Sequence, residues 1–387
     1  MNAKAPSNIT TMFIGIMTLI AVMGIGRFSL TPQIPVMIND GYLTLSGAGI
    51  MASMNYIGYL IGALHVSRMQ SRHAFYLKAG LLITVMATLL SGSTPNFALQ
   101  CLFRLAAGIG GAWALIIVTT WTQLILLGNR APRLSAAVFT GPGLGITLSG
   151  LLAWFMSTAH YHASRSWYIY GTVALLAALI IFRHLPKEVD SAQPHVNKTP
   201  VSSNLKRLVF IYALAGFGYI LPATFLSQMA RTTFPVGQIS AFFWPLFGLS
   251  SAIGVILVIF FAAQFNTRNS LAGAMILQGI GVAAAVLIHN VAGLLISTIL
   301  TGLGFLVIMQ LTMRLARELS SGSMARTVGL LTSGYATGQL IGPLISSLSI
   351  ALFSSQEPAL LLAAAGLVLG GVGVVTLLHS ESARPAG

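Results

Sequence analysis

Two arginines inside long apolar stretches are the residues best suited to chemistry in this chain. Read as helices with a rise of about 1.5 Å per residue, the stretches place Arg104 about 10 Å and Arg27 about 12 Å from one end. An arginine near the middle of a membrane helix costs about 2.5–3.5 kcal/mol, so it normally faces a wet cavity or a partner. Because a guanidinium matches carboxylate or phosphate in a bidentate way, we predict that both arginines bind an anionic group. The alternative is that each bonds helix carbonyls and braces the packing.

Polar and aromatic side chains in other apolar stretches are further candidates for the same site. They are Asn55, Tyr56, Tyr59, Tyr219, Gln228, Gln310, Tyr335 and Gln339. Asn55 and Tyr59 are four residues apart, so a helix would place them on one face. Each residue alone is more typical of a bond between helices or of the aromatic belt at a membrane surface. As a set, they predict a polar, aromatic cavity.

The composition indicates that these stretches lie in a membrane. Of 387 residues, 56% are hydrophobic and 7% are charged, and the mean hydropathy is +0.85. A water-soluble protein carries about a quarter charged residues, so most of this surface must face lipid. Helices are required because lipid offers the backbone no hydrogen-bond partner, and consecutive apolar residues exclude the alternating strands of a barrel.

Twelve stretches are long enough to cross about 30 Å of hydrocarbon. We place these spans at 9–34, 44–67, 74–93, 97–127, 134–157, 165–185, 208–230, 237–264, 270–288, 292–316, 325–353 and 358–379.

The basic residues predict the orientation. Of the 20 lysines and arginines, only Arg165 and Arg231 fall in loops on one side, two lie inside spans, and the rest fall on the other side. Basic residues accumulate in cytoplasmic loops. We therefore predict a multi-pass protein of the bacterial inner (plasma) membrane with both termini in the cytoplasm. The net charge of +14 follows from this topology and requires no nucleic-acid partner.

The chain divides into two similar halves. Residues 186–207 form the longest polar segment, which predicts a cytoplasmic linker between six spans on each side. Gly24-x-Gly26 matches Gly216-x-Gly218 at an offset of 192 residues (216 − 24). Because six crossings are an even number, both copies enter the membrane from the same face and the repeat is parallel.

Two more matches support this repeat. The segment from Arg133 to Gly145 aligns with 326–338 at an offset of 193, and Gly108-x-Gly110 aligns with Gly302-x-Gly304 at an offset of 194. We predict an all-α membrane protein of two pseudo-twofold-related six-helix bundles, residues 1–185 and 208–387.

These features resemble the major facilitator superfamily over nearly the whole chain. Arg104-Leu-Ala-Ala-Gly108 fits a fourth-span pattern of that superfamily, and Gly141-Pro142-Gly-Leu-Gly145 fits a fifth-span pattern of many exporters. The first-span segment from Gly24 to Pro32 is similar to a small, poorly characterised bacterial branch. The resemblance implies a monomer with a substrate cavity lined by the first, fourth, seventh and tenth spans, which works by rocker-switch alternating access.

One loop differs from the sequence pattern that is usual in that superfamily. After the second span, Gly62 to Arg72 keeps the glycine and the basic residues but lacks the acidic residue and second glycine of the usual gate. We assign gating or packing to residues of these motifs and of the repeat, which are Gly62, Arg68, Arg72, Gly108, Gly141, Pro142, Gly145, Gly334 and Gly338.

No acidic residue lies in the middle of a predicted span. The chain has six acidic residues, which are Asp40, Glu188, Asp190, Glu318, Glu357 and Glu381. Proton-driven transporters commonly use a buried carboxylate as a relay. Any coupling must therefore use Asp40 at the outer mouth, His65 near the inner end of the second span, or a charge on the substrate; otherwise the protein is a uniporter or an exchanger. We favour weak or substrate-borne coupling.

The motifs for other activities are missing. The chain has no P-loop, no His-Glu-x-x-His and no Gly-x-Ser-x-Gly, and His160-x-His162 is a weak metal signal. Its single cysteine, Cys101, cannot form an internal disulfide. We predict a cofactor-free, metal-free secondary active or facilitative transporter for a small organic solute, leaning toward an anion and toward efflux. The alternatives are a non-transporting sensor on a transporter scaffold and, least favoured, an intramembrane enzyme.

Overall fold

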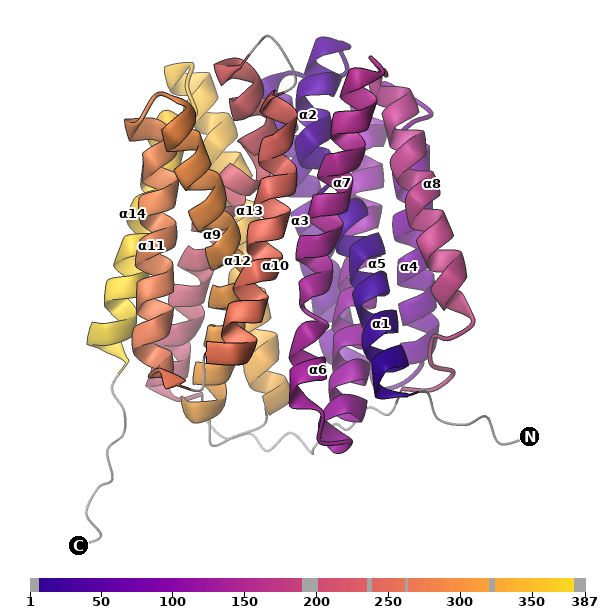
Figure 1. The fold of residues 1–387 in the computed structure, drawn as a ribbon, viewed down its shortest axis with the longest axis vertical. Coiled ribbons are helices and arrows are strands. Elements are labelled where there is room, and N and C mark those ends of the chain that lie inside the picture. The colour runs from indigo at the N-terminus through magenta and orange to yellow at the C-terminus, as the bar shows by residue number, and fades with distance from the viewer. Residues whose placement is uncertain (1–6, 190–200, 235–238, 262–263, 320–323, 379–387) are drawn as a thin grey trace, which may run out of the picture.

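A computed structural model describes residues 7–189, 201–234, 239–261, 264–319 and 324–378, with the side chains of 324–326 outside this description. The described chain is helical and contains twelve helices long and apolar enough to cross a membrane. They stand side by side (Figure 1). We call the end where α1 begins and α14 ends the base, and the end where α2 ends and α3 begins the top.

The first six spans confirm the predicted number. The first is divided into α1 (Asn8–Leu19), a π-helical turn η1 (Ile20–Ile25) and α2 (Leu30–Asn39), and it ends five residues later than predicted. The others are α3 (Leu45–Arg68), α4 (His73–Leu90), α5 (Phe97–Gly128), α6 (Pro132–Ala137) with α7 (Thr140–Thr158), and α8 (Ala163–Phe182).

Six more spans follow the linker. They are α9 (Ser203–Thr233), η2 (Ile239–Phe242) with α10 (Phe243–Phe261), α11 (Thr267–Leu287), α12 (Val291–Leu319), α13 (Met324–Phe353) and α14 (Glu357–Leu377). α9 begins five residues before the predicted 208, because the Ser202 hydroxyl accepts a hydrogen bond from Leu205 N (3.2 Å) and caps the helix there. The short break predicted at 288–292 is present between α11 and α12. Linker residues 190–200 lie outside the described residues, and the division into two domains stays a prediction.

The outside of the bundle is apolar. Leu179 and Leu369 are 62% and 67% exposed, and many other large hydrophobic side chains are also exposed on the surface. Such a surface is stable only against lipid or another apolar surface.

The first span breaks at its glycines. In the π turn, Gly26 N donates to Ala21 O and Phe28 N donates to Met23 O, both at 2.9 Å, in place of the usual helical pattern. Pro32 has no N–H and its ring clashes with the carbonyl four residues earlier, so the helix restarts only at Leu30. The break leaves main-chain carbonyls without a helical partner, and side chains supply one: Ser29 Oγ donates to Ile25 O.

The two halves repeat the same close helix crossings. A Cβ on Gly145 would lie 2.6 Å from Gly24 Cα, so the fifth span touches the backbone of the first. At an offset of 193, a Cβ on Gly338 would overlap the carbonyl of Ala213 in the seventh span. The small residues of the fourth span behave similarly: a Cβ on Gly108 would overlap Asn55 O, and its counterpart Gly302 packs against a neighbouring main chain in the same way. The repeated glycines therefore have a shared packing role.

Hydrogen bonds join the halves in the upper part of the bundle. Thr31 Oγ1 donates to Ala223 O (2.6 Å), and Ser347 Oγ donates to Ser46 O (2.9 Å). α7 and α10 also pack together, with Trp244 Nε1 donating to Ser149 Oγ (3.2 Å). These bonds join neutral groups, so closure at the top uses hydroxyls and carbonyls.

Candidate functional site

Arg27 lies in the break of the first span and is held by aromatic rings. Its guanidinium carbon is 4.8 Å from the ring centre of Tyr56, 4.9 Å from Tyr59 and 5.3 Å from Phe28. We call these four residues the Arg27 cage. The arginine is 8% exposed, and within the described chain its Nε and Nη2 have no hydrogen-bond partner. The three ion pairs found among described residues do not include it. The cage thus presents N–H donors and a cation for which the described residues supply no acceptor and no counter-ion.

The second half faces this cage with a column of stacked rings. Tyr219 of α9 stacks on Phe305 of α12 at 4.5 Å and on Tyr335 of α13 at 5.7 Å, each with an interplanar angle of 9°. Tyr335 stacks in turn on Tyr212 at 4.4 Å. Gln339 Nε2 donates to the Tyr219 hydroxyl (2.8 Å), which fixes that ring. Stacked faces of this kind favour a flat or aromatic group on a ligand.

The cage and the column meet across the two halves. Tyr56 exchanges a hydrogen bond with Thr224 Oγ1 of α9 (3.2 Å between oxygens), while Phe28 packs edge-on against Phe305 at 5.8 Å. Tyr56 therefore contacts both the arginine and, through its hydroxyl, the opposite half. Five spans contribute to this site: the first, second, seventh, tenth and eleventh.

Arg104 has a different environment from Arg27. It is 0% exposed, Nη1 donates to Gly26 O (3.0 Å) and Nη2 donates to Ser91 Oγ (2.9 Å). Its guanidinium carbon lies 4.7 Å from the Trp167 ring centre. Asn55 Nδ2 donates to Arg104 O (3.0 Å), so the Asn55 amide joins α3 to α5. This geometry matches the bracing alternative, because Arg104 satisfies the carbonyl next to Arg27.

Other predicted residues lie outside the cage. Gln228 and Gln310 are half-buried, and each has one buried amide atom without a partner among the described residues, but neither bonds to the cage. His65 is exposed and packs edge-on against Tyr76 at 4.9 Å, near the base. A role in binding or coupling for these three stays a prediction.

Asp40 caps a helix at the top. Its carboxylate accepts a hydrogen bond from Ala163 N at the start of α8 (2.7 Å) and lies 3.4 Å from His162 Nδ1. Burial, and then the Asp40 carboxylate, raises the pKa of the Tyr42 hydroxyl. An acid at a helix N-terminus is stabilising in its own right. A role for Asp40 in coupling stays a prediction beside this structural one.

The predicted gating residues divide into packing glycines and exposed arginines. A Cβ on Gly62 would lie 2.7 Å from Ile109 O, on Gly141 2.7 Å from Leu19 Cβ, and on Gly334 2.8 Å from Val209 Cγ1. Pro142 is buried beside Gly141 in α7. Arg68 and Arg72 are exposed at the base, and Arg72 precedes α4 in the left-handed conformation (φ 64°). Gating by these residues stays a prediction.

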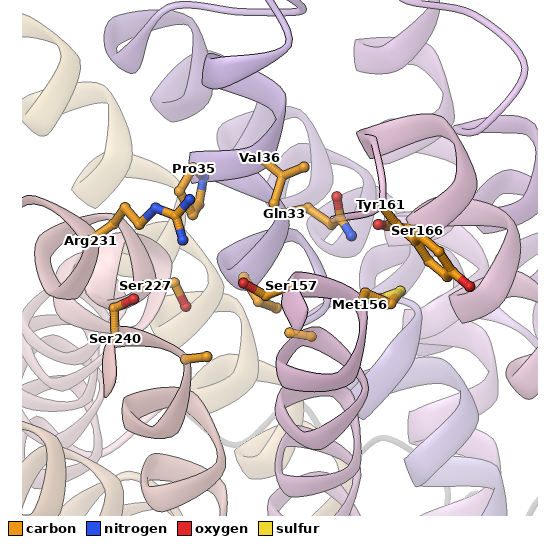
Figure 2. Close-up of a pocket in the computed structure, with 13 residues that line it drawn as sticks. Gln33, Pro35, Val36, Met156, Ser157, Tyr161, Ser166, Ser227, Arg231 and Ser240 are labelled. Carbon is orange, nitrogen blue, oxygen red and sulfur yellow. The ribbon is translucent and has the colours of Figure 1, made fainter. Parts of the chain in front are cut away.

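A separate pocket lies between the halves near the top. Figure 2 shows Arg231 beside Pro35, with Gln33 on the side of Tyr161 and Ser166. Gln33 is 1% exposed and its Oε1 has no partner within the described chain. The pocket encloses about 60 Å³, whereas the aromatic contacts and the unpartnered donors of a buried cation lie at Arg27. We therefore place the candidate site at the Arg27 cage.

Phe28, Phe305, Thr224 and Gln33 were absent from the sequence prediction. The repeat held a signal for one of them, because Phe305 stands at the position of Gly111 in the first half (305 − 194). A large ring where the other half has glycine indicates a local difference between halves. The other three carry no comparable signal, since phenylalanine, threonine and glutamine are ordinary residues in such spans.

Solved structures share this fold. The D-xylose-proton symporter has a TM-score of 0.78 at 11% identity, covering 97% of this chain and 99% of the symporter. The nucleoside transporter NupG has a TM-score of 0.71 at 12% identity, covering 97% of this chain and 99% of NupG. A bacterial homologue of the human lysosomal transporter Spinster, inward-facing and unoccupied, has a TM-score of 0.68 at 15% identity, covering 97% and 95%. At these identities the likeness shows the fold alone.

Sequence comparison defines the family. The chain is 25% identical over 277 residues to the uncharacterized MFS-type transporter YceJ of Bacillus subtilis (strain 168), which covers 67% of this chain and 68% of YceJ. The family model described as uncharacterised MFS-type transporter YbfB matches residues 19–375. Because that match extends over most of the sequence, the chain belongs to this family of major facilitator superfamily transporters.

Proposed function

We propose that this protein is a secondary transporter of a small organic anion and that Arg27 binds the anionic group. The observation that carries the proposal is the Arg27 cage, where a nearly buried guanidinium has two unpartnered nitrogen atoms and no counter-ion among the described residues. A carboxylate or phosphate would accept bonds from those donors and neutralise the charge. The ring column beside it would then contact the rest of the solute.

The arrangement of the halves supports alternating access. The site lies between them, and hydrogen bonds such as Thr31 to Ala223 join them near the top. Rocking about the site would break these bonds and open the top while closing the base. The site would then face one side of the membrane at a time.

The charges support an orientation. Arg130, Arg183 and Arg268 lie at the base, whereas Arg165 and Arg231 lie at the top. By the positive-inside rule, the base would face the cytoplasm of a bacterial inner membrane. Export as the direction of transport is proposed on the Gly141-Pro142-x-x-Gly145 pattern alone. These glycines also pack closely against the first span.

A neutral solute is the second candidate, because structural neighbours include transporters named for a nucleoside and for D-xylose. Their low identity supports the fold only, and a neutral sugar would leave the charge of Arg27 unbalanced. An anion accounts for that charge, and we prefer it for this reason.

A thermal-shift experiment on the detergent-purified chain tests the proposal. The panel contains benzoate, lactate and inorganic phosphate as anions, choline and spermidine as cations, and adenosine and D-xylose as neutral solutes. We expect stabilisation by one or more anions, lost in Arg27→Gln and kept in the control Arg133→Gln, whose side chain is exposed at the base. Stabilisation by cations or neutral solutes only, or equal anion binding by Arg27→Gln, contradicts the proposal.

A further inference from the structure

We infer that this transporter is an obligatory anion exchanger, because the empty site carries a positive charge that hinders its return across the membrane. The inference rests on the proposed function and adds the mode of transport to it. Its basis is the difference between the two buried arginines.

Arg104 has bonded terminal nitrogen atoms, and only its Nε has no partner among the described residues. Two of its nitrogen atoms donate to Gly26 O and Ser91 Oγ, at 3.0 and 2.9 Å. Arg27 lies next to that same carbonyl, yet its Nε and Nη2 have no partner within the described chain. The cage therefore holds donors that an anion, but not the protein's described groups, can satisfy.

The acidic residues are engaged elsewhere. Asp40 binds the start of α8, Glu318 lies beside Thr267 and Arg314, and Glu357 lies beside His289. The other three fall outside the twelve spans: Glu188 follows α8, and Asp190 and Glu381 lie in sequence beyond α8 and α14. Among the described residues, no carboxylate therefore pairs with Arg27.

The aromatic rings compensate for this charge only in part. Three ring faces lie 4.8–5.3 Å from the guanidinium carbon, and cation–π contacts of this kind are favourable. Ring faces do not accept the bonds of the in-plane Nε and Nη2 donors, however. A dehydrated cation with unmet donors stays costly until an anion binds.

Closure of the halves makes that cost part of the transport cycle. Tyr56 stacks on Arg27 and bonds to Thr224 of the other half, so the cage lies at the surface where the halves close. Each change of access passes through a state closed at both ends, in which the guanidinium is sealed from water. With an anion bound, the sealed site is neutral; without one, it is charged. Return without an anion is therefore slow, and transport proceeds by exchange.

Single-molecule fluorescence on the full chain measures this return directly. Dyes are placed on Thr158→Cys and Phe353→Cys, at the top ends of α7 and α13, in a Cys101→Ala background. Opening and closing are recorded in a Tris chloride buffer without any organic anion, and then with sodium benzoate. We expect the empty protein to interconvert at least about tenfold more slowly than Arg27→Gln, because the neutral variant seals no charge.

A matched variant separates charge from shape. Arg27→Lys keeps the positive charge and loses the planar fork, so it must stay slow like the parent chain. If Arg27→Gln elutes as aggregate, Arg27→Met serves as the neutral variant. Equal rates for the empty parent and the neutral variant overturn the inference, as does an Arg27→Lys protein as fast as Arg27→Gln.

The two proposals fail in different ways. Loss of anion stabilisation in Arg27→Gln, together with fast interconversion of the empty parent chain, would keep the anion site and refute obligatory exchange. Anion stabilisation that survives Arg27→Gln would refute the anion site itself, whatever the interconversion rates.

Discussion

Alanine at the crossing of the first and fifth spans should destabilise the first half. A Cβ on Gly145 would lie 2.6 Å from Gly24 Cα and 3.0 Å from Ile20 Cα, and both neighbours are backbone atoms that cannot rotate away. Overpacking of a well-packed site costs about 1–3 kcal/mol, and a backbone clash belongs at the upper end of that range. Gly145→Ala should therefore lower the free energy of unfolding by about 2–3 kcal/mol, measured by SDS titration of the protein in detergent micelles.

Two further glycines turn this into a matched series. Gly338→Ala in the second half should cost a similar amount, because its Cβ would overlap the carbonyl of Ala213. Gly273 lies in α11 with nothing within 4 Å of an added Cβ, so Gly273→Ala should be neutral or stabilise by up to about 1 kcal/mol through helix propensity. If Gly145→Ala is as stable as Gly273→Ala, the proposed close crossing is wrong.

Three other outcomes test the site and its surroundings. Tyr56→Phe loses the bond to Thr224, worth about 0.5–1.5 kcal/mol, and should shift the single-molecule population toward an open top by about two- to tenfold, whereas Tyr59→Phe should not. Arg104→Lys cannot serve both Gly26 O and Ser91 Oγ, so it should lower stability in SDS titration by about 1–3 kcal/mol and weaken stabilisation by benzoate. In intact cells, an impermeant thiol reagent should label Arg165→Cys and Arg231→Cys but not Arg130→Cys or Arg183→Cys; the reverse pattern would invert the proposed orientation.

The sequence was sufficient for the number and course of the spans. Apolar length decides whether a segment crosses lipid, and this property is local, so even the short break between α11 and α12 was predicted. The repeat was also readable, because glycines at helix crossings have a steric cause: Gly145 and Gly338 each touch a preceding span of their own half. The residue boundaries depend on caps such as Ser202, which hydropathy does not weigh.

The interior of the site was less predictable. Arg27 and Arg104 lie at similar depth, and composition gives no reason to separate them. They differ because the π turn releases the Gly26 carbonyl toward Arg104, and that turn depends on the glycines that bring the first and fifth spans together. Asn55 and Tyr59 share a face by spacing, yet the Asn55 amide bonds to Arg104 O while the Tyr59 ring covers Arg27. The contact that each side chain makes depends on the helices packed beside it, which the sequence spacing does not reveal.

The contrast between the two arginines connects the fold to the proposed mechanism. Arg104 supports the broken first span by bonding to Gly26 O, and that break places the next residue, Arg27, among aromatic rings. Both terminal nitrogen atoms of Arg104 thus have acceptors and hold the main chain, whereas the terminal Nη2 of Arg27 has no partner among the described residues and lies at the surface where the halves close. A protein that needed both charges only for packing would gain stability by satisfying both. The unmet donors of Arg27 are therefore best understood as a requirement for a ligand, and the same requirement makes the empty site slow to cross the membrane.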